Sequence, residues 1–329
     1  MPRVLIGAAT IRNVQGPFRE VLKEAGFEIV LPPMARQMTE DELIEQLKGI
    51  DAVLAGSEPY TPRVFDARPE LQVVARNGVG YDAVDVPAAT AHGLPVTVAP
   101  ANQDAVAEHT FALILALAKQ VLPQHLAMKQ GEWPRKATQP LRGQVLGLAG
   151  LGRIGKAVAL RGKAFGMRVI AFEPYPDEAF VRQHAISLVP LDRVFAEADY
   201  VSLHMPLTPD SKHCIGQKLF GLMKPTAYFV NTARGPIVCE DELYEAIKNR
   251  KIAGAGLDVF EEEPPSAKLP LLQLDNVVLT AHTAGVDERS GVEMSHLAAK
   301  TIVALSRGEW PEGMVVNPEV KKTFKWKKR

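Results

Sequence analysis

The chain has 329 residues, of which 47% are hydrophobic and 23% are charged. This composition is that of a globular protein and excludes a disordered, collagen-like or coiled-coil chain. The 38 Lys and Arg residues balance the 38 Asp and Glu residues, so no global field favours binding to nucleic acid. The length suits two compact domains of about 100 to 200 residues each.

The sequence indicates neither a membrane span nor a secretory signal. Its longest apolar run, Phe111 to Ala118, is much shorter than the ~20 residues that a membrane helix requires. The first residues lead directly into a strand-like segment, so we expect a cytoplasmic protein. Cys214 and Cys239 lack both metal-ligand spacing and disulfide density, so we expect no metal site. The basic C-terminal tail, residues 321–329, is expected to be solvated.

Short β-branched segments alternate with amphipathic segments, which is typical of an α/β protein with parallel sheets flanked by helices. The first strands are expected at Val4–Ala8, Phe27–Leu31, Asp51–Ala55, Leu71–Arg76 and Pro95–Ala99. A helix is expected over Pro17–Ala25, because proline suits its first turn and Gly26 ends it. Another begins after Thr39, which forms a capping box with Glu42.

A second series of strands follows Lys119. It is expected at Val145–Ala149, Arg168–Phe172, Tyr200–His204, Ala227–Asn231, Gly254–Asp258 and Val277–Ala281. Six strands match a full dinucleotide-binding sheet. The preceding segment, Asn102–Lys119, is apolar on nearly every face, so we expect it to be buried between domains or against another subunit. The final helical segment, Val286–Leu305, follows the last strand and would return the chain to the first domain.

A glycine-rich motif marks the expected cofactor site. The strand Val145–Ala149 leads into Gly150-Leu151-Gly152-Arg153-Ile154-Gly155 and then into a helical segment. The first glycine allows a tight turn, the second allows a pyrophosphate to approach, and the third allows helix–strand packing. Glu173 ends the next strand, where its carboxylate is placed to bind ribose hydroxyls and to repel a 2′-phosphate. The sequence therefore predicts NAD rather than NADP.

Polar side chains follow several strands of the second series, and ligands of such sheets lie beyond these carboxyl ends. Reducing a carbonyl requires a proton, which His282 is suited to supply. Glu263 would hold that imidazole, and Arg234 would grip a carboxylate and polarise the adjacent carbonyl, which favours 2-oxo acids. His204 and His109 suit structural roles at least as well.

These motifs resemble the D-isomer-specific 2-hydroxyacid dehydrogenase family over nearly the whole chain. The resemblance rests on Gly147–Gly155, His204-Met205-Pro206-Leu207-Thr208, Asn231-Thr232-Ala233-Arg234-Gly235, Leu257–Pro264 and Thr280-Ala281-His282-Thr283-Ala284-Gly285. It implies that Arg234, Glu263 and His282 are catalytic. It also implies that Asp258 contacts the nicotinamide carboxamide and that Val106 packs on the ring. The remaining residues assigned to the cofactor are Gly150, Gly152, Arg153, Ile154, Gly155, Glu173, His204, Pro206, Thr208, Thr232 and Ala233.

The resemblance also implies the domain organisation. Residues 1–99 and 285–329 would form a flavodoxin-like substrate domain, and residues 100–284 an inserted NAD-binding Rossmann domain. The loop Asn77-Gly78-Val79-Gly80 resembles the family's substrate-carboxylate loop, whose backbone amides form an anion-binding nest. Family members are usually homodimers, which here would join through residues 100–140, with Trp133 as a packing anchor.

Two positions depart from the family pattern. Ala281 replaces the usual proline before the catalytic histidine, which would loosen the backbone there. Glu58 lies near the place where phosphoglycerate dehydrogenases commonly have arginine, so a phosphate there would meet a like charge. Arg63, Arg76 and Arg135 are alternative phosphate contacts. The pattern is nevertheless similar to short phosphoglycerate dehydrogenases.

Several functions therefore remain open. We expect a D-2-hydroxyacid dehydrogenase acting on a small 2-oxo or 2-hydroxy acid, most similar to phosphoglycerate dehydrogenase. Glyoxylate or hydroxypyruvate reduction is the alternative substrate assignment. An NADH-sensing corepressor is a non-enzymatic alternative, which the intact Arg234, Glu263 and His282 set disfavours. Formate dehydrogenase fits poorly, because that relative tends to have glutamine at the position of Glu263.

Overall fold

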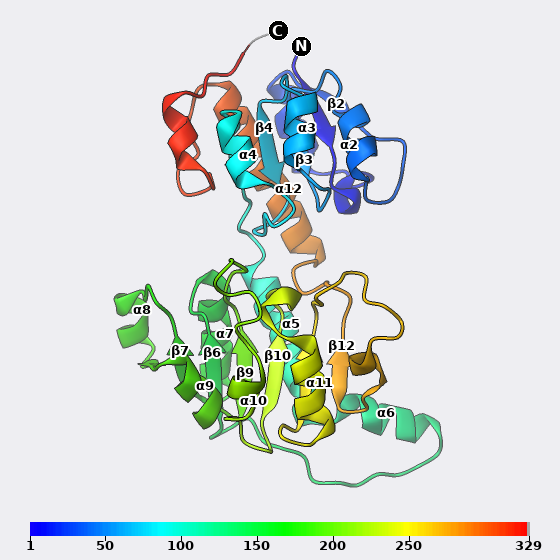
Figure 1. The fold of residues 1–329 in the computed structure, drawn as a ribbon, viewed down its shortest axis with the longest axis vertical. Coiled ribbons are helices and arrows are strands. Elements are labelled where there is room, and N and C mark those ends of the chain that lie inside the picture. The colour runs from blue at the N-terminus through cyan, green and yellow to red at the C-terminus, as the bar shows by residue number, and fades with distance from the viewer. Residues whose placement is uncertain (328–329) are drawn as a thin grey trace. The chain divides into compact units, whose positions relative to one another are not determined.

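A computed structural model describes residues 1–327 (Figure 1). The chain folds into two compact units, residues 1–102 with the chain from residue 286 onward, and Gln103–Gly285. We call them unit 1 and unit 2. Their boundaries lie within three residues of those expected from the sequence. Each unit contains one parallel sheet covered by helices, so the predicted α/β class is confirmed.

Unit 1 contains the first five strands of the chain. Its strands are β1 (Arg3–Ile6), β2 (Glu28–Val30), β3 (Ala52–Ala55), β4 (Val73–Arg76) and β5 (Val96–Thr97). Its helices are η1 (Ala9–Ile11), α1 (Pro17–Glu24), α2 (Glu40–Gln46), α3 (Pro62–Ala67), α4 (Val86–Ala91), α12 (Glu288–Ser306) and η4 (Pro318–Lys322). The predicted capping box is present at α2, where the Thr39 hydroxyl accepts from the Glu42 amide and the Glu42 carboxylate accepts from the Thr39 amide.

The sheet of unit 1 has the strand order β2-β1-β3-β4-β5, which is the flavodoxin-like doubly wound order. Alternate side chains of its strands enter two separate cores, because successive residues of a strand point to opposite faces. Val4 and Ile6 of β1 pack with α1 and α12, whereas Leu5 packs with α2, α3 and α4. Helix α12 thus returns the chain to unit 1, as predicted.

Within the described part of the C-terminal tail, the basic side chains are exposed, as expected, whereas Phe324 and Trp326 pack on the core of unit 1. The Trp326 ring packs edge-on against Phe27, with 5.8 Å between ring centroids. The Gln72 amide donates to the Lys327 carbonyl at 3.1 Å and accepts from the Lys327 amide at 2.6 Å. The Trp326 side chain buries apolar surface on unit 1, which the basic composition of the tail did not indicate.

Unit 2 contains the other seven strands. They are β6 (Val145–Ala149), β7 (Arg168–Phe172), β8 (Ser187–Leu188), β9 (Tyr200–Leu203), β10 (Tyr228–Asn231), β11 (Gly254–Leu257) and β12 (Val277–Leu279). The helices are α5 (Gln103–Ala118), α6 (Val121–Lys129), α7 (Arg153–Ala164), α8 (Glu178–Gln183), α9 (Leu191–Glu197), α10 (Gln217–Phe220), η2 (Gly235–Ile237), α11 (Glu240–Lys248) and η3 (Pro270–Gln273).

The sheet of unit 2 has the order β12-β11-β10-β9-β6-β7-β8. Counted from β6, this is the 3-2-1-4-5-6 order of a dinucleotide-binding fold with one further strand. The sequence predicted six of the seven strands and missed β8. That strand has only two residues, both exposed, so it lacks the apolar run that marked the others.

Helices cover both faces of this sheet (Figure 1). The cores show that α9, α10 and α11 pack on one face and α5 and α7 on the other. Helix α5 contacts α7 and strands β10 to β12 within its own unit. Gly256 of β11 allows this packing, because a Cβ atom there would lie 3.0 Å from Leu113 of α5. The core of unit 2 itself therefore accounts for the apolar sequence of α5.

Within residues 1–327, no single helix is both long and apolar enough to cross a bilayer. Helices α5 and α6 together reach that length and hydropathy, but the chain bends by 59° between them.

Candidate active site

The glycine-rich loop joins β6 to α7, and its first and third glycines are required by close backbone contacts. Gly150 has a φ of +106°, and a Cβ atom there would lie 2.7 Å from the His204 carbonyl. A Cβ atom on Gly155 would lie 2.3 Å from the carbonyl oxygen of Gly150. These two glycines let the loop, the following helix and the end of β9 pack together.

Gly152 differs from its two neighbours, because a Cβ atom there would meet no atom of the chain within 4 Å. It is the N-cap residue of α7, and because glycine has no side chain, the first helical amides receive no side-chain cap. Arg153 begins the helix and Ile154 packs against the core of unit 2. The open side of Gly152 and these amides fit an anion such as a pyrophosphate at a helix N-terminus.

Glu173 follows β7 and reaches back to the glycine-rich loop. Its Oε2 atom accepts from the Leu151 amide at 2.8 Å, and its Oε1 atom accepts from the Tyr175 amide at 3.1 Å. The carboxylate is thus fixed beside the loop, on the strand next to β6, where a dinucleotide ribose is bound in this fold. A negative charge held there opposes a 2′-phosphate.

The segment after β9 contains His204, Pro206 and Thr208. The His204 Nε2 atom pairs with the Ser202 hydroxyl at 2.9 Å, and its Nδ1 atom is buried without a hydrogen-bond partner in the described chain. Burial lowers the pKa of His204 to about 3, so its imidazole is neutral near pH 7. The Pro206 carbonyl and the Thr208 amide both bond Ser211, which fixes the turn.

Thr232 and Ala233 follow β10 and are held by side chains behind them. The Thr232 hydroxyl lies 2.9 Å from the Thr110 hydroxyl of α5, and the Ala233 amide donates to Asn231 at 2.9 Å. Val106, one turn before Thr110, is buried. Thr110 thus links Val106 to Thr232 within unit 2, and the contact of these residues with a cofactor stays a prediction.

Arg234 follows on the same loop, and Gly235 brings that loop against the segment after β11. A Cβ atom on Gly235 would lie 1.9 Å from both the carbonyl carbon and the oxygen of Phe260. Only glycine permits this approach, which places Arg234 beside the segment that contains Glu263. In the sequence, Gly235 is only the last residue of the Asn231–Gly235 motif, and its position directly after Arg234 is the one signal of this packing role.

His282 and Glu263 form the central contact of the site. The Nδ1 atom of His282 lies 2.6 Å from Oε2 of Glu263. Burial alone would raise the pKa of Glu263, but the bond from His282, the Phe260 amide at 3.0 Å, and the charges of His282 and Arg234 together lower it. Glu263 is therefore ionised and accepts a hydrogen bond from Nδ1, so Nε2 is the ring nitrogen of His282 that faces away from this contact.

Asp258 fixes the loop that contains His282. Its carboxylate is fully buried and accepts from the Thr280 hydroxyl at 2.6 Å and from the amides of Thr283 and Ala284 at 2.9 Å. The backbone carbonyl of Asp258 accepts from the His282 amide at 2.7 Å. His282 has a φ of +52°, a conformation that persists only where the surroundings fix it. These bonds hold the backbone although Ala281 replaces the usual proline.

His109 of α5 also bonds this loop, through its Nε2 atom at 2.9 Å from the Thr280 hydroxyl. The structural role that the sequence suggested for His109 agrees with this contact. Sequence reasoning did not find Thr280, which links His109 to Asp258. The contact of Asp258 with a nicotinamide stays a prediction, whereas its bonds to the loop are observed.

In unit 1, the loop Asn77-Gly78-Val79-Gly80 follows β4 as expected. Arg76 holds it from behind, because its guanidinium donates to the Gly80 carbonyl at 2.8 Å and to the Ala55 carbonyl at 3.2 Å. The Asn77 amide donates to the same Ala55 carbonyl at 2.8 Å. Arg76 is buried, and its hydrogen bonds to the two carbonyls hold this loop in place.

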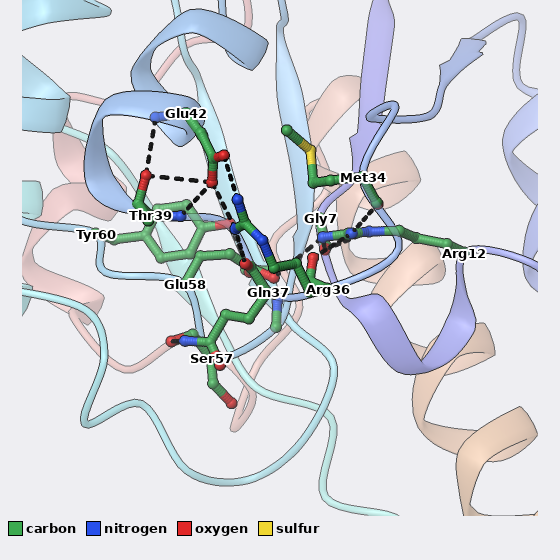
Figure 2. Close-up of polar contacts among 12 residues, drawn as sticks. Gly7, Arg12, Met34, Arg36, Gln37, Thr39, Glu42, Ser57, Glu58 and Tyr60 are labelled. Atoms are coloured by element: carbon green, nitrogen blue, oxygen red, sulfur yellow. Dashed lines mark hydrogen bonds and ion pairs between the residues drawn. The ribbon is translucent and has the colours of Figure 1, made fainter. Parts of the chain in front are cut away.

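Glu58 is buried beneath its own loop and paired with Arg12, as Figure 2 shows. It accepts from the Gly56 amide at 2.8 Å and lies 3.6 Å from the Arg12 guanidinium. Arg12 also donates to the carbonyls of Gly7 and Met34. The expectation that Glu58 presents a like charge to a phosphate is therefore wrong, because its carboxylate stabilises the loop.

The other arginines suggested as phosphate contacts are placed elsewhere. Arg63 is exposed and pairs with Glu40 and Asp41 at 2.7 and 2.6 Å. Arg135 lies on the exposed segment before Gln139, whose amide donates to the Thr226 carbonyl ahead of β10. Gln139 thus ties this segment to the amino end of β10, whereas Arg234 follows the carboxyl end of that strand.

Comparison with known proteins agrees with this geometry. Residues 111–284 match the model of the D-isomer specific 2-hydroxyacid dehydrogenase, NAD binding domain. A glyoxylate reductase of Korarchaeum cryptofilum is 40% identical over 91% of this chain and 92% of its own length. A D-3-phosphoglycerate dehydrogenase of Methanocaldococcus jannaschii is 40% identical over 92% of this chain, but the match spans only 57% of that protein.

A solved structure is also similar over nearly the whole chain. D-Lactate dehydrogenase of Aquifex aeolicus, complexed with NAD and lactic acid, gives a TM-score of 0.84 at 29% identity and covers 95% of this chain and 98% of its own. The chain therefore belongs to the D-isomer specific 2-hydroxyacid dehydrogenase family. It is an NAD-dependent oxidoreductase that acts on a CH–OH group.

Proposed function

We propose that this enzyme reduces a small, unphosphorylated 2-oxo acid of the glyoxylate or hydroxypyruvate type to its D-2-hydroxy acid. The observation that carries the reaction class is the His282–Glu263 contact of 2.6 Å on the sheet that contains the glycine-rich loop. An imidazole held by an ionised carboxylate beside a nicotinamide site is suited to deliver the proton that accompanies hydride transfer.

The residues of the chain take separate roles in this reaction. The glycine-rich loop and Glu173 would hold NADH, which would supply the hydride. His282 donates a proton from Nε2 to the carbonyl oxygen, while its Nδ1 atom keeps its own proton and donates it in a hydrogen bond to Glu263, whose charge stabilises the imidazolium. The Arg234 guanidinium binds the substrate carboxylate with two hydrogen bonds and polarises the carbonyl. In oxidation, His282 accepts the proton instead.

The substrate assignment rests on the arginines of unit 1. Arg76 is committed to the carbonyls of Ala55 and Gly80, and Arg63 to Glu40 and Asp41. Arg12 is buried against Glu58. A phosphate dianion favours cations that are available to it, so these contacts support an unphosphorylated substrate. The full-length match to the glyoxylate reductase supports the same choice.

D-3-Phosphoglycerate dehydrogenase activity is the second candidate, and the 40% identity to such an enzyme favours it. Initial rates of NADH oxidation with glyoxylate, hydroxypyruvate and phosphohydroxypyruvate separate the two. We expect the first two to give a kcat/KM at least about tenfold above the third, which corresponds to about 1.4 kcal/mol. A higher value for phosphohydroxypyruvate would reverse the assignment. Tight NADH binding without turnover of any 2-oxo acid would instead support an NADH sensor.

We also propose a homodimer that forms through residues 100–140, in the cytoplasm. The part of this region that supports the proposal is α6 and the segment after it, since α5 is already buried within unit 2. Large apolar side chains are exposed there, namely Val121, Leu122, Leu126, Met128 and Trp133. Such a patch favours a protein partner. Light scattering should give a molar mass in solution of twice the chain mass. The Leu126→Glu variant should have the mass of a single chain.

A further inference from the structure

Glu263 lies on a segment without regular structure. After β11, residues 258–269 form no helix or strand, yet Glu263 must hold His282 within hydrogen-bond distance. Within the segment, Glu263 is fixed by the Phe260 amide, which donates to its Oε1 atom at 3.0 Å. The anchoring of Phe260 and Glu261 therefore decides where the Glu263 carboxylate lies.

Two glutamates fasten this segment to the start of α11. The Glu261 amide donates to Oε1 of Glu240 at 2.7 Å, and the Glu240 amide donates to Oε1 of Glu261 at 2.9 Å. Each residue thus bonds the backbone of the other, across 21 positions of sequence. Glu240 is the first residue of α11, and the N-cap residue Cys239 supplies no side-chain bond. The Glu261 carboxylate caps this helix from outside, where the helix dipole favours a negative charge.

A third loop supports the same contact. The Nε2 atom of His213 lies 3.1 Å from Oε2 of Glu261, and the His213 amide donates to the Pro236 carbonyl at 2.9 Å. His213 thereby joins the turn after β9 to the loop of Arg234 and to the segment of Glu263. All three loops follow the carboxyl ends of neighbouring strands.

The charged groups around Glu240 affect the pKa of its carboxyl group. Its half-buried carboxyl has a raised pKa, because of burial first and then the charges of Glu261, Asp241 and Glu263. His213 faces Glu261, and His282 and Arg234 face Glu263. The bond from the Glu261 amide needs an oxygen atom at Glu240 but no charge. A glutamine at position 240 can therefore keep the bond, whereas an alanine cannot.

We propose that Glu240 and Glu261 are positioning residues for Glu263, which fix the segment after β11 so that the Glu263 carboxylate meets His282. This inference rests on the proposed role of Glu263. Among residues 1–327, no hydrogen bond or ion pair joins Glu240 to His282 or to the glycine-rich loop, so its effect on turnover should pass mainly through the segment that contains Glu263.

The test is a double-mutant cycle on kcat for 2-oxo acid reduction, with NADH affinity and melting temperature measured for each variant. We expect Glu240→Ala to lower kcat about 10- to 100-fold, the scale of a small misplacement. NADH affinity should stay within about twofold, and Glu240→Gln should recover most of the activity. In a Glu263→Gln background, Glu240→Ala should have little further effect, because the group that it positions is already altered.

Glu262→Gln is the matched control, because Glu262 is an exposed acid on the same segment with no hydrogen bond or ion pair among the described residues. It should leave kcat within about twofold. Equal activity of Glu240→Ala and the parent enzyme, equal losses in the alanine and glutamine variants, or additive effects of Glu240→Ala and Glu263→Gln would each overturn the inference. His213→Gln tests the same anchor if Glu240→Ala fails to fold, and should show the same non-additivity with Glu263→Gln. Unchanged kcat in Glu263→Gln would refute the proposed function instead.

Discussion

The Nδ1 atom of His282 lies 2.6 Å from the Oε2 atom of Glu263, although the two residues belong to loops that follow different strands. Asp258 holds the first loop and Glu240 holds the second. His282 and Glu263 are therefore each held in place by hydrogen bonds that other residues make to their loops. An ionised carboxylate beside an imidazole favours the protonated ring, which is the form that donates the proton in the proposed mechanism.

Replacing Glu263 by Gln should change the pH dependence of the reaction. The amide can still accept from Nδ1, but it removes the negative charge that favours the imidazolium. We expect kcat for reduction to decline at a pH about one unit lower than in the parent enzyme. The measurement is kcat against pH with saturating NADH and 2-oxo acid. A profile identical to that of the parent would argue against a charged Glu263.

Alanine substitutions at Gly152 and Gly235 should affect different properties, NADH affinity in the first variant and stability in the second. Gly152→Ala places its Cβ in open space, so the melting temperature should stay constant while NADH affinity falls about tenfold or more, because the pyrophosphate loses its approach. Gly235→Ala meets the Phe260 backbone at 1.9 Å and should lower both stability and turnover. Thermal unfolding and NADH titration separate the effects. Unchanged NADH affinity in Gly152→Ala would contradict the cofactor site.

Replacing Glu173 by Ala should relax the choice of cofactor. The substitution removes a charge that opposes a 2′-phosphate and also the bond to the Leu151 amide. We expect the NADPH-to-NADH ratio of kcat/KM to rise about tenfold or more, with part of the change due to weaker NADH binding. The measurement is kcat/KM for both cofactors. If the parent enzyme had equal kcat/KM values for NADH and NADPH, Glu173 would not select between the two cofactors.

His204 should make stability depend on pH. Its pKa is lowered by burial from 6.5 to about 3 in the folded chain, so below pH 6.5 the unfolded chain binds a proton that the folded chain does not. Stability therefore falls as pH decreases, by about 2 kcal/mol between about pH 7 and pH 5 from this group. Urea unfolding of the parent and of His204→Gln should show this difference. Parallel pH dependences would show that the pKa of His204 is not lowered by folding.

The sequence predicted most of the fold because its evidence is local. The apolar runs of β6 and β7, the capping box at Thr39 and the glycine-rich loop each identify an element within a few residues of sequence. Strand β8 was missed because its two residues are exposed, and the docking of Trp326 was missed because its partner Phe27 lies far away in the sequence. Burial of α5 was predicted correctly, but its partner proved to be the core of its own unit.

The sequence predicted which residue types form the candidate site, but it did not predict the contacts that hold them in place. The residue types of Arg234, Glu263 and His282 and their places after strands sufficed to group them. The contacts that fix them were hidden, because Thr280, Gly235 and Glu240 act through backbone atoms or through another side chain. Glu58 was misjudged for the same reason, since only the fold reveals its burial against Arg12.

The most direct test of the proposed mechanism is the turnover of His282→Gln together with its NADH affinity. If His282 supplies the proton, kcat for glyoxylate or hydroxypyruvate reduction should fall about 10²- to 10⁴-fold, while the dissociation constant for NADH stays within about twofold. Retention of parent-level turnover by His282→Gln would contradict the account.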